Sequence, residues 1–488
     1  MNKSTGRVIS LFIVIALLTL CFNSAEVSAS EDVGSNNQVS SNPVKLNISC
    51  DTLPGETFHI IADNDRYTFF VAKTDTCLNI QAAEPVKGIY CMFEKPCQWT
   101  LTLPDGTIRK EGEDEIIHKY IPLDSAVTDF TINLSENAVL TDIYAFSSET
   151  PPDWVQIWEP PCERADLMLM PTHADDEHLW FGGAMPYYAG ELGYKVQVVY
   201  LTSHNNNTVR NHERLNGLWK VGVRNYPIVT EKFLDVIATK RSLEDAERIF
   251  GRNRVLEFQV EMLRRFAPRV IIAHDINGEY GHGAHKLNAS TLLDALQIYE
   301  DPAVFPESAQ KYGIHKVQKC YLHLWPENTI TVSWSEKQLS HFGGKSAFQM
   351  AIQGYYCHWS QLKWANAVNE YGKKDCRKFG LAYTTVGYDT PGLNDMFEHV
   401  DMSDNNDDRN QSDTPVTEES DDSNDTSSGT NDEKQPDKNV SDSDLLAYFN
   451  RAKISKKDLM IALAAMAVSL IAIIYVIVIK KRENNVVS

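Results

Sequence analysis

This chain of 488 residues lacks the features that would place it in two common classes of protein. None of its nine cysteines stands in a CxxC pair, which argues against a cysteine-rich zinc site. Basic residues are not in excess either, since 46 Lys and Arg stand against 66 Asp and Glu, a formal net charge of −20. A protein that binds nucleic acid usually carries a basic patch, so no nucleic-acid partner is expected.

Uncharged apolar runs mark the two ends of the chain. Residues 1–29 combine Lys3 and Arg7, an apolar run and the small residues "VSA", which is typical of a cleaved secretory signal peptide. An uncleaved anchor is the alternative. Residues 459–479 carry no charge, and 21 such residues can cross a bilayer as a helix. Together the ends predict a single-pass protein of the cell membrane, with an extracellular body and a cytoplasmic tail over 480–488.

The segment before the predicted transmembrane helix has almost no large apolar side chains. From 401 to 444 it contains 15 acidic and 3 basic residues, so it has little to bury and its charges repel one another. We expect a disordered acidic stalk over 401–447, with an acidic interaction tail as the alternative.

The cysteines allow two interpretations. Eight remain once Cys21 has left with the signal peptide, and an even number permits disulfides in an exported protein. Buried thiols without disulfides are the alternative.

Two patterns of apolar residues divide the body into two domains. Residues 45–150 hold short strand-like segments separated by turn residues such as "PDG" at 104–106, which predicts a β-sandwich of jelly-roll type. A joint rich in Pro and Trp follows over 151–163. From 164 to 400 strand-like runs alternate with helical patterns, including one long helix over 241–267, which predicts a Rossmann-like parallel sheet. The expected fold class is α/β, preceded by an all-β sandwich and followed by a transmembrane helix.

Two polar clusters follow strand-like runs of the α/β domain. "PTHADDEHLW" at 171–180 comes after "ADLMLM", and "HDINGEYGHGAHK" at 274–286 continues the run "RVIIAHD". Parallel strands end at a common edge of their sheet, where ligands bind, so the two clusters are expected to meet. Alone, each has an ordinary explanation, because "ADDE" suits a helix N-terminus and "HGAH" suits a solvated surface.

Zinc would explain why acids and histidines gather at this edge. A catalytic zinc usually has three protein ligands and one open position, and His173, Asp176 and His285 can form such a set. Asp175 is left beside the metal, where a general base would activate water. His282, one turn from His285, could donate to the oxyanion of an attacked carbonyl and then protonate a leaving amine. The predicted chemistry is metal-assisted hydrolysis of an acyl bond.

"PTHADDE" together with "GEYGHGAH" resembles the LmbE-like family of zinc-dependent de-N-acetylases, which includes the GlcNAc-phosphatidylinositol de-N-acetylases, or PIG-L proteins. The resemblance covers roughly residues 164–300. It implies the roles already given to His173, Asp175, Asp176, His282 and His285. It also matches Tyr280 to a tyrosine that helps to hold the oxyanion in some members. "RNHE" at 210–213 resembles an element of the family that could contact substrate.

The second motif departs from the pattern of the family. Many members read H-P-D-H there, whereas Gly283 and Ala284 separate the histidines of this chain, so a carboxylate is missing. Gly281 and Gly283 would leave room for a substrate near the loop. Zinc is implied by the resemblance, because a His/His/Asp set also suits other divalent metals.

The expected function is that of a membrane-anchored extracellular hydrolase which removes N-acetyl groups from amino sugars, with an N-acetylated sugar or glycan as its substrate. A jelly roll beside the enzyme could bind glycan, by analogy of fold. One alternative is a glycan-binding surface protein with an inactive α/β unit. Another is an amidase acting on a different N-acyl conjugate. The sequence does not indicate an oligomeric state.

Overall fold

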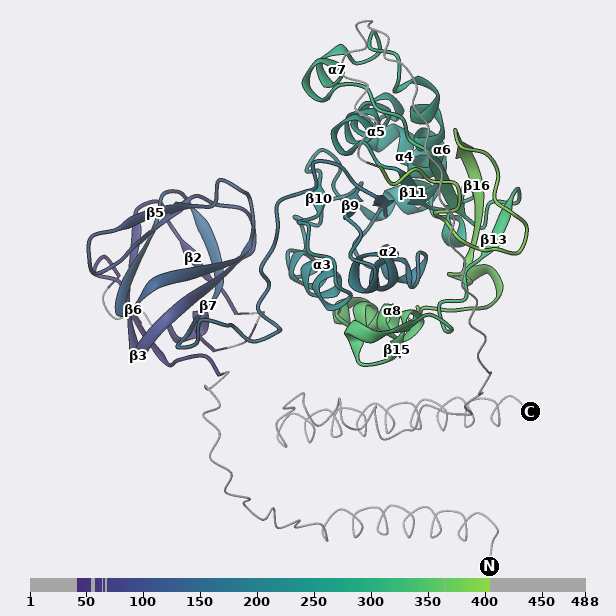
Figure 1. The fold of residues 1–488 in the computed structure, drawn as a ribbon. Coiled ribbons are helices and arrows are strands. Elements are labelled where there is room, and N and C mark those ends of the chain that lie inside the picture. Colours follow the sequence, from purple (N-terminus) through teal and green to yellow (C-terminus); the bar gives the residue numbers. More distant parts are fainter. Residues whose placement is uncertain (1–41, 54–57, 64, 66–67, 365, 404–488) are drawn as a thin grey trace, which may run out of the picture. The chain divides into compact units, whose positions relative to one another are not determined.

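The computed structural model describes residues 42–53, 58–63, 65, 68–364 and 366–403, drawn in colour in Figure 1. The predicted signal peptide, transmembrane helix and cytoplasmic tail lie outside these residues, as does the predicted stalk from 404 onward. Among the described residues, no helix has both the length and the apolar character that a membrane crossing needs.

Strands between residues 46 and 146 form one antiparallel sheet, with the order β2-β7-β3-β6-β4-β5 and β1 paired to β3. The first half of β3 pairs with β1 and its second half with β7, and register shifts between Gln81 and Gly88 separate the halves. The strands are β1 (Leu46–Ser49), β2 (Phe70–Ala72), β3 (Thr76–Phe93), β4 (Trp99–Thr102), β5 (Ile108–Glu111), β6 (His118–Leu134) and β7 (Ala138–Phe146). The division into the two sheets of a jelly roll stays a prediction.

A second sheet has the order β10-β9-β8-β11-β12-β16-β13, in which the first five strands are parallel and β16 pairs antiparallel with both β12 and β13. All residues of β8 and β11 are buried, as expected for strands covered on both faces. The strands are β8 (Leu167–Met170), β9 (Val196–Tyr200), β10 (Ile228–Val229), β11 (Val270–Ala273), β12 (Lys319–His323), β13 (Thr329–Thr331) and β16 (Lys378–Thr384). The predicted α/β domain with a parallel sheet is confirmed.

Helices alternate with the parallel strands (Figure 1). The main ones are α2 (Asp176–Leu179), η2 (Met185–Glu191), α3 (Val209–Lys220), η3 (Ile237–Lys240), α4 (Leu243–Phe250), α5 (Arg252–Phe266), η4 (Glu279–Gly281), α6 (Gly283–Ile298), α7 (Pro306–Tyr312) and α8 (Ala347–Tyr356). The prediction of one long helix over 241–267 is wrong. Gly251, with a φ of 79°, breaks it into α4 and α5, because this backbone conformation cannot continue a right-handed helix.

The order of the strands creates a crevice beside β8. The chain runs from β8 outward to β9 and β10, and then returns to β11 on the other side of β8. Met170 at the end of β8 is in register with Ala273 at the end of β11. At such a reversal the two loops leave the sheet side by side, and ligands of open α/β sheets bind there. Both polar clusters of the sequence follow these two strand ends, as predicted.

The eight cysteines of the described residues form no disulfide with one another. Six of them are buried, and Cys77 and Cys357 are half-buried. Of the two interpretations of the sequence, the structure therefore shows thiols.

Candidate metal centre

Backbone contacts at the end of β8 bring the first polar cluster against the second. Asn288 on α6 donates to the carbonyl of Met170 and to the hydroxyl of Thr172, each over 3.0 Å. The amide of Thr172 donates to Nε2 of His274 over 2.9 Å. These contacts join the loops that follow β8 and β11, so a polar helix residue replaces the neighbouring strand where the sheet ends.

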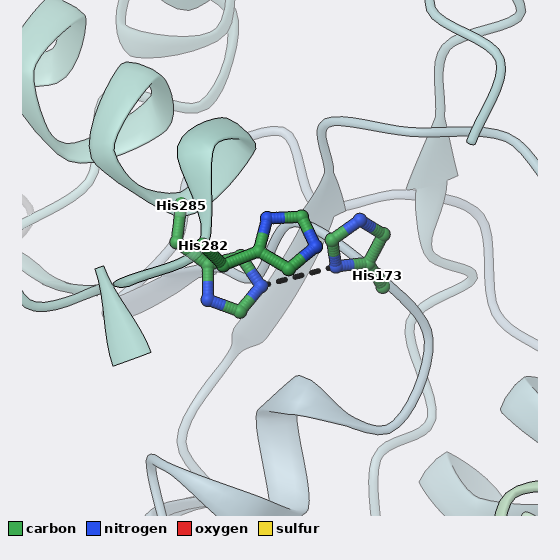
Figure 2. Close-up of side chains that lie close together, drawn as sticks. All are labelled: His173, His282 and His285. Carbon is green, nitrogen blue, oxygen red and sulfur yellow. Dashed lines mark hydrogen bonds between the residues drawn. The ribbon is translucent and has the colours of Figure 1, made fainter. Parts of the chain in front are cut away.

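Three predicted ligands converge in this crevice. Nδ1 of His173 lies 3.1 Å from Oδ2 of Asp176 and 3.1 Å from Nε2 of His285, and the last two atoms are 3.2 Å apart. All three side chains are buried. Figure 2 shows His173 facing His285, with His282 beside them. Ligand atoms about 2.1 Å from a tetrahedral zinc are separated by about 3.4 Å, so the three atoms fit a zinc ion between them.

Two further combinations of ligands are possible at the same place. His282 could join His173 and His285, and His274 could join Asp176 and His285. His274 is a poor ligand, because Nε2 accepts from the amide of Thr172 and Nδ1 faces Glu279. The set predicted from the sequence remains the best match, and its assignment stays a prediction.

The two adjacent aspartates differ in their surroundings. Burial raises the pKa of Asp175 well above its usual value, although Arg210 opposes the shift. Burial alone would also raise the pKa of Asp176, but His285 and His274 outweigh it and hold the pKa well below its usual value. Asp176 is therefore ionised, as its predicted role as a ligand requires, whereas Asp175 is suited to take up a proton.

Asp175 is held in an uncommon backbone conformation, with a φ of 108°. Its amide donates to Oε2 of Glu177 over 2.9 Å, and its Oδ1 lies 3.2 Å from the guanidinium of Arg210. Arg210, on α3, also contacts the carbonyl of Ala174 and is 6% exposed. The sequence suggested a substrate contact for the "RNHE" element. The structure places Arg210 against the carboxylate of the predicted base, and the substrate contact stays a prediction.

His282 offers a hydrogen-bond donor at the edge of the site. Its Nδ1 accepts from the amide of Ala284 over 3.2 Å, so in the neutral ring the proton is on Nε2. That atom is buried and has no hydrogen-bond partner. Burial, followed by the neighbouring His285 and His173, lowers the pKa of His282 far below its usual value. The neutral ring, with its proton on Nε2, can therefore donate a hydrogen bond to an oxyanion.

Tyr280 lies at the mouth of the site. Its side chain is 65% exposed, and its ring is centred 5.7 Å from that of His282. Its φ of 46° turns the short helix η4 so that the ring lies over the histidines. The hydroxyl can thus reach a substrate from the solvent side.

Sequence reasoning missed the carboxylate that supports the histidines. Oε2 of Glu279 lies 2.7 Å from Nδ1 of His274 and 2.8 Å from Nδ1 of His285, and Oε1 lies 3.1 Å from Nδ1 of His323. A carboxylate behind a ligand histidine fixes its tautomer and orientation. Glu279 stands inside the quoted motif "GEYGHGAH", six residues before His285, which is the only signal that the sequence offers for it.

Asp235 was missed as well. Its Oδ1 lies 3.5 Å from Nε2 of His173, and its Oδ2 lies 3.6 Å from Nδ1 of His204 and 3.6 Å from Arg210. His204 in turn accepts from the amide of Ala174 over 3.1 Å. Asp235 follows β10, far from both motifs in the sequence, so no local pattern indicates it.

The second-motif glycines do not both leave space for a substrate. A Cβ at Gly281 would meet no atom within 4 Å, so there the expectation holds. A Cβ at Gly283 would lie 2.0 Å from the carbonyl oxygen of Ser242. Gly283 is needed because α6 begins directly against the backbone before α4.

Fold and site together define an α/β domain with a buried His/His/Asp centre at the switch point of a parallel sheet. No family model matches the sequence. A 1D-myo-inositol 2-acetamido-2-deoxy-alpha-D-glucopyranoside deacetylase of Saccharopolyspora erythraea is 30% identical over 173 residues, 31% of this chain and 63% of the relative. A second deacetylase of this name, from Catenulispora acidiphila, is 25% identical over 199 residues, 35% of this chain and 59% of the relative.

The chain thus spans about three fifths of the length of these curated relatives. Their names confirm the resemblance to the LmbE-like and PIG-L family of deacetylases. Among solved structures, the N,N'-diacetylchitobiose deacetylase of Pyrococcus horikoshii is similar with a TM-score of 0.30 and 15% identity, over 41% of this chain and 72% of that one.

Proposed function

We propose that the α/β domain removes the N-acetyl group from an amino sugar by hydrolysis. The observation that carries the proposal is the arrangement of His173, Asp176 and His285, whose ligand atoms lie 3.1 to 3.2 Å apart, beside the carboxylate of Asp175 and the Nε2 proton of His282. The deacetylase relatives support the reaction, because their names specify a 2-acetamido sugar.

His173, Asp176 and His285 would hold a zinc ion, since all three are buried and their ligand atoms have the spacing of a tetrahedral site. The ion would act as a Lewis acid on the acetyl carbonyl and lower the pKa of water. Contacts with neighbouring residues keep the ligand side chains in place. Trp180 donates to Oδ1 of Asp176 over 2.9 Å, and Glu279 faces the far nitrogen of His285.

Asp175 carries out the proton transfers, and His282 and Tyr280 stabilise the oxyanion by hydrogen bonds. Asp175 takes a proton from the water that attacks the acetyl carbon, and Arg210 holds its carboxylate in place. The Nε2–H of His282, aided by the hydroxyl of Tyr280, donates to the oxyanion. Asp175 then passes its proton to the sugar nitrogen as the C–N bond breaks, which yields a free amine and acetic acid, and the acid loses its proton to water and leaves as acetate. The sequence had suggested His282 for this second transfer; the lowered pKa of its ring favours Asp175 instead.

The proposed location of the protein narrows the class of substrate. We place the chain outside the cell, anchored by residues 459–479, where N-acetylated glycans and their fragments are available; this rests on the sequence alone. In the antiparallel sheet, an open groove of about 360 Å³ is lined by amide and hydroxyl side chains such as Asn47, Asn79 and Gln81. Such groups suit a sugar, so this domain is proposed to bind glycan.

Release of acetate tests the reaction. The full chain, loaded with Zn²⁺, would be incubated with N-acetylglucosamine oligomers, muropeptides and mucin glycans. Asp175→Asn should keep its metal and lose turnover by about 10²- to 10⁴-fold, because the base is gone while the ligands stay. Asp176→Asn should lose metal affinity as well.

The alternatives predict other results. Binding of these glycans without acetate release, by a protein with metal bound, would replace the proposal with a glycan-binding protein. Release of a longer acyl group from other N-acyl conjugates, with none from the acetylated sugars, would replace it with the amidase.

A further inference from the structure

A second cluster of buried ligand-type side chains lies beside the first site. Glu177 and His178 are on α2, and His358 follows α8. All three are fully buried. Oε1 of Glu177 lies 3.5 Å from Nε2 of His178 and 3.3 Å from Nε2 of His358. We call these residues the Glu177–His178–His358 cluster.

The cluster leaves an unusual number of polar atoms without hydrogen bonds. Both ring nitrogens of His178 and Nδ1 of His358 are buried and have no hydrogen-bond partner, whereas Nε2 of His358 and Oε1 of Glu177 face each other at 3.3 Å. A buried polar atom without a partner is destabilising, and native proteins rarely tolerate several at one place. A cation between the three side chains would satisfy one nitrogen of each histidine and the carboxylate oxygen together.

The spacing and the surrounding space fit a metal ion. The two separations from Oε1 are close to the roughly 3.4 Å expected between ligand atoms of a tetrahedral zinc. A Cβ added at Gly217 would lie 2.7 Å from Nε2 of His178 and 2.9 Å from Nε2 of His358. Glycine on α3 thus keeps open the space directly beside both nitrogens.

We infer that the Glu177–His178–His358 cluster binds a second divalent transition-metal ion. Two imidazoles and one carboxylate suit Zn²⁺, whereas Mg²⁺ and Ca²⁺ prefer sites made of oxygen ligands. The ion would have a positioning role. Oε2 of Glu177 accepts from the amide of Asp175 over 2.9 Å, so an ion on Oε1 fixes the carboxylate that holds the backbone of Asp175. The inference does not depend on the proposed reaction.

Metal content of the purified full chain tests the inference. The protein would be stripped with a chelator, reloaded with Zn²⁺, freed of unbound metal and analysed by inductively coupled plasma mass spectrometry. The wild type should hold about two ions per chain. His358→Ala should hold about one, because a ligand is lost. Gly217→Ala should also hold about one, although every ligand remains, because the new Cβ occupies the space beside the nitrogens.

Two controls separate the sites. His315→Ala should keep both ions, since His315 lies 3.2 Å from the carbonyl of Tyr312 and belongs to neither cluster. Asp176→Asn should lose the ion of the first site and keep the one at His358. A wild type with one ion that is lost in Asp176→Asn and kept in His358→Ala would overturn the inference while leaving the proposed function intact.

Folding of each variant would be followed by circular dichroism. If His358→Ala does not fold, the stoichiometry of the wild type and of Gly217→Ala decides the question. Co²⁺ in place of Zn²⁺ gives an independent readout. Two equivalents should bind to the wild type, and the absorption of the second should be missing in Gly217→Ala; an absorption titration that saturates at one equivalent in both proteins would contradict the inference.

Discussion

Glu279 contacts three histidines around the predicted zinc site. A variant of Glu279 tests how far the affinity for the metal depends on residues that do not bind it. Glu279→Gln would leave Nδ1 of His285 facing an uncharged amide 2.8 Å away. We expect the affinity for Zn²⁺ to fall by about 10- to 100-fold, because the orientation and basicity of the ligand are lost. Competition with a chromophoric chelator measures this change.

Glu307→Gln, an exposed carboxylate on α7, serves as the control for Glu279→Gln and should bind zinc as the wild type does. Equal affinity in Glu279→Gln and in the wild type would show that the carboxylate does not support the site.

Arg210 tests the positioning of the predicted base. Arg210→Gln removes the guanidinium 3.2 Å from Oδ1 of Asp175, so the carboxylate can turn away from its working position. We expect kcat to fall by about 100-fold while zinc content and KM stay close to the wild type. Steady-state kinetics with parallel metal analysis would separate these effects.

Arg248→Gln, at an exposed arginine on α4, is the matched control and should not change kcat. If Arg210→Gln raised KM alone, the arginine would be a substrate contact, as the sequence had suggested.

At the scale of residues, the sequence predicted what local spacing can reveal. His173, Asp175 and Asp176 are neighbours, and His282 and His285 are one turn apart, so the two motifs taken together could be recognised. Glu279, Asp235 and His323 could not be assigned, because they reach the site through the positions of β10, β11 and β12 in the sheet. Contacts of this kind depend on tertiary structure, and no short pattern encodes them.

At the scale of elements, Gly283 fixes where α6 begins. Its Cβ would lie 2.0 Å from the carbonyl of Ser242 and 2.6 Å from that of Thr239. Gly283→Ala should therefore push the helix outward, lowering the free energy of unfolding by about 3 kcal/mol and weakening zinc binding through His285. Chemical denaturation and chelator competition measure the two effects.

Gln297→Ala, on the exposed face of the same helix, should change stability by less than about 0.5 kcal/mol. A Gly283→Ala variant with the stability and zinc affinity of the wild type would mean that α6 can shift without cost.

Element boundaries were predicted less well than element types. The strands and helices of the α/β domain alternate as expected, because apolar runs and helical periodicity are local signals. The break at Gly251 was not foreseen, since an isolated glycine is tolerated within many helices. Its φ of 79° shows that the chain turns there, so that α4 and α5 pack separately.

At the scale of the whole molecule, counting thiols distinguishes a protein with free cysteines from one with disulfides. The structure contains eight cysteines and no disulfide among the described residues. Burial raises the pKa of Cys97 and of Cys162 to about 12, so these thiols should react slowly in the native protein. In denaturant without reductant, a thiol reagent should detect all eight in a chain that begins at Ser30.

Reductant should leave the Tm of the native protein unchanged, since no disulfide constrains its unfolded state. Protein kept under reducing conditions and freed of the reductant immediately before labelling provides the reference count. A loss of two or more thiols in protein isolated from its natural location would instead show that disulfides form there.

The two ends of the chain predict where the protein would act, and this prediction of its location rests on the sequence alone. A helix of 21 uncharged residues over 459–479 would be about 32 Å long, enough to cross the hydrocarbon core. The acidic segment before it is predicted from its composition to form no core, which would leave it open to a protease. Protease added to intact cells should therefore release an active fragment that contains residues 42–403 into the medium.

Deleting residues 459–488 should send the whole chain into the medium without protease, because the anchor is gone while the signal peptide remains. The N-terminus of the released chain should be Ser30. If protease reached the chain only after lysis, the body would lie inside the cell. The proposed substrates would then have to be cytosolic N-acetylated sugars, whereas the chemistry at His173, Asp176 and His285 would be unaffected.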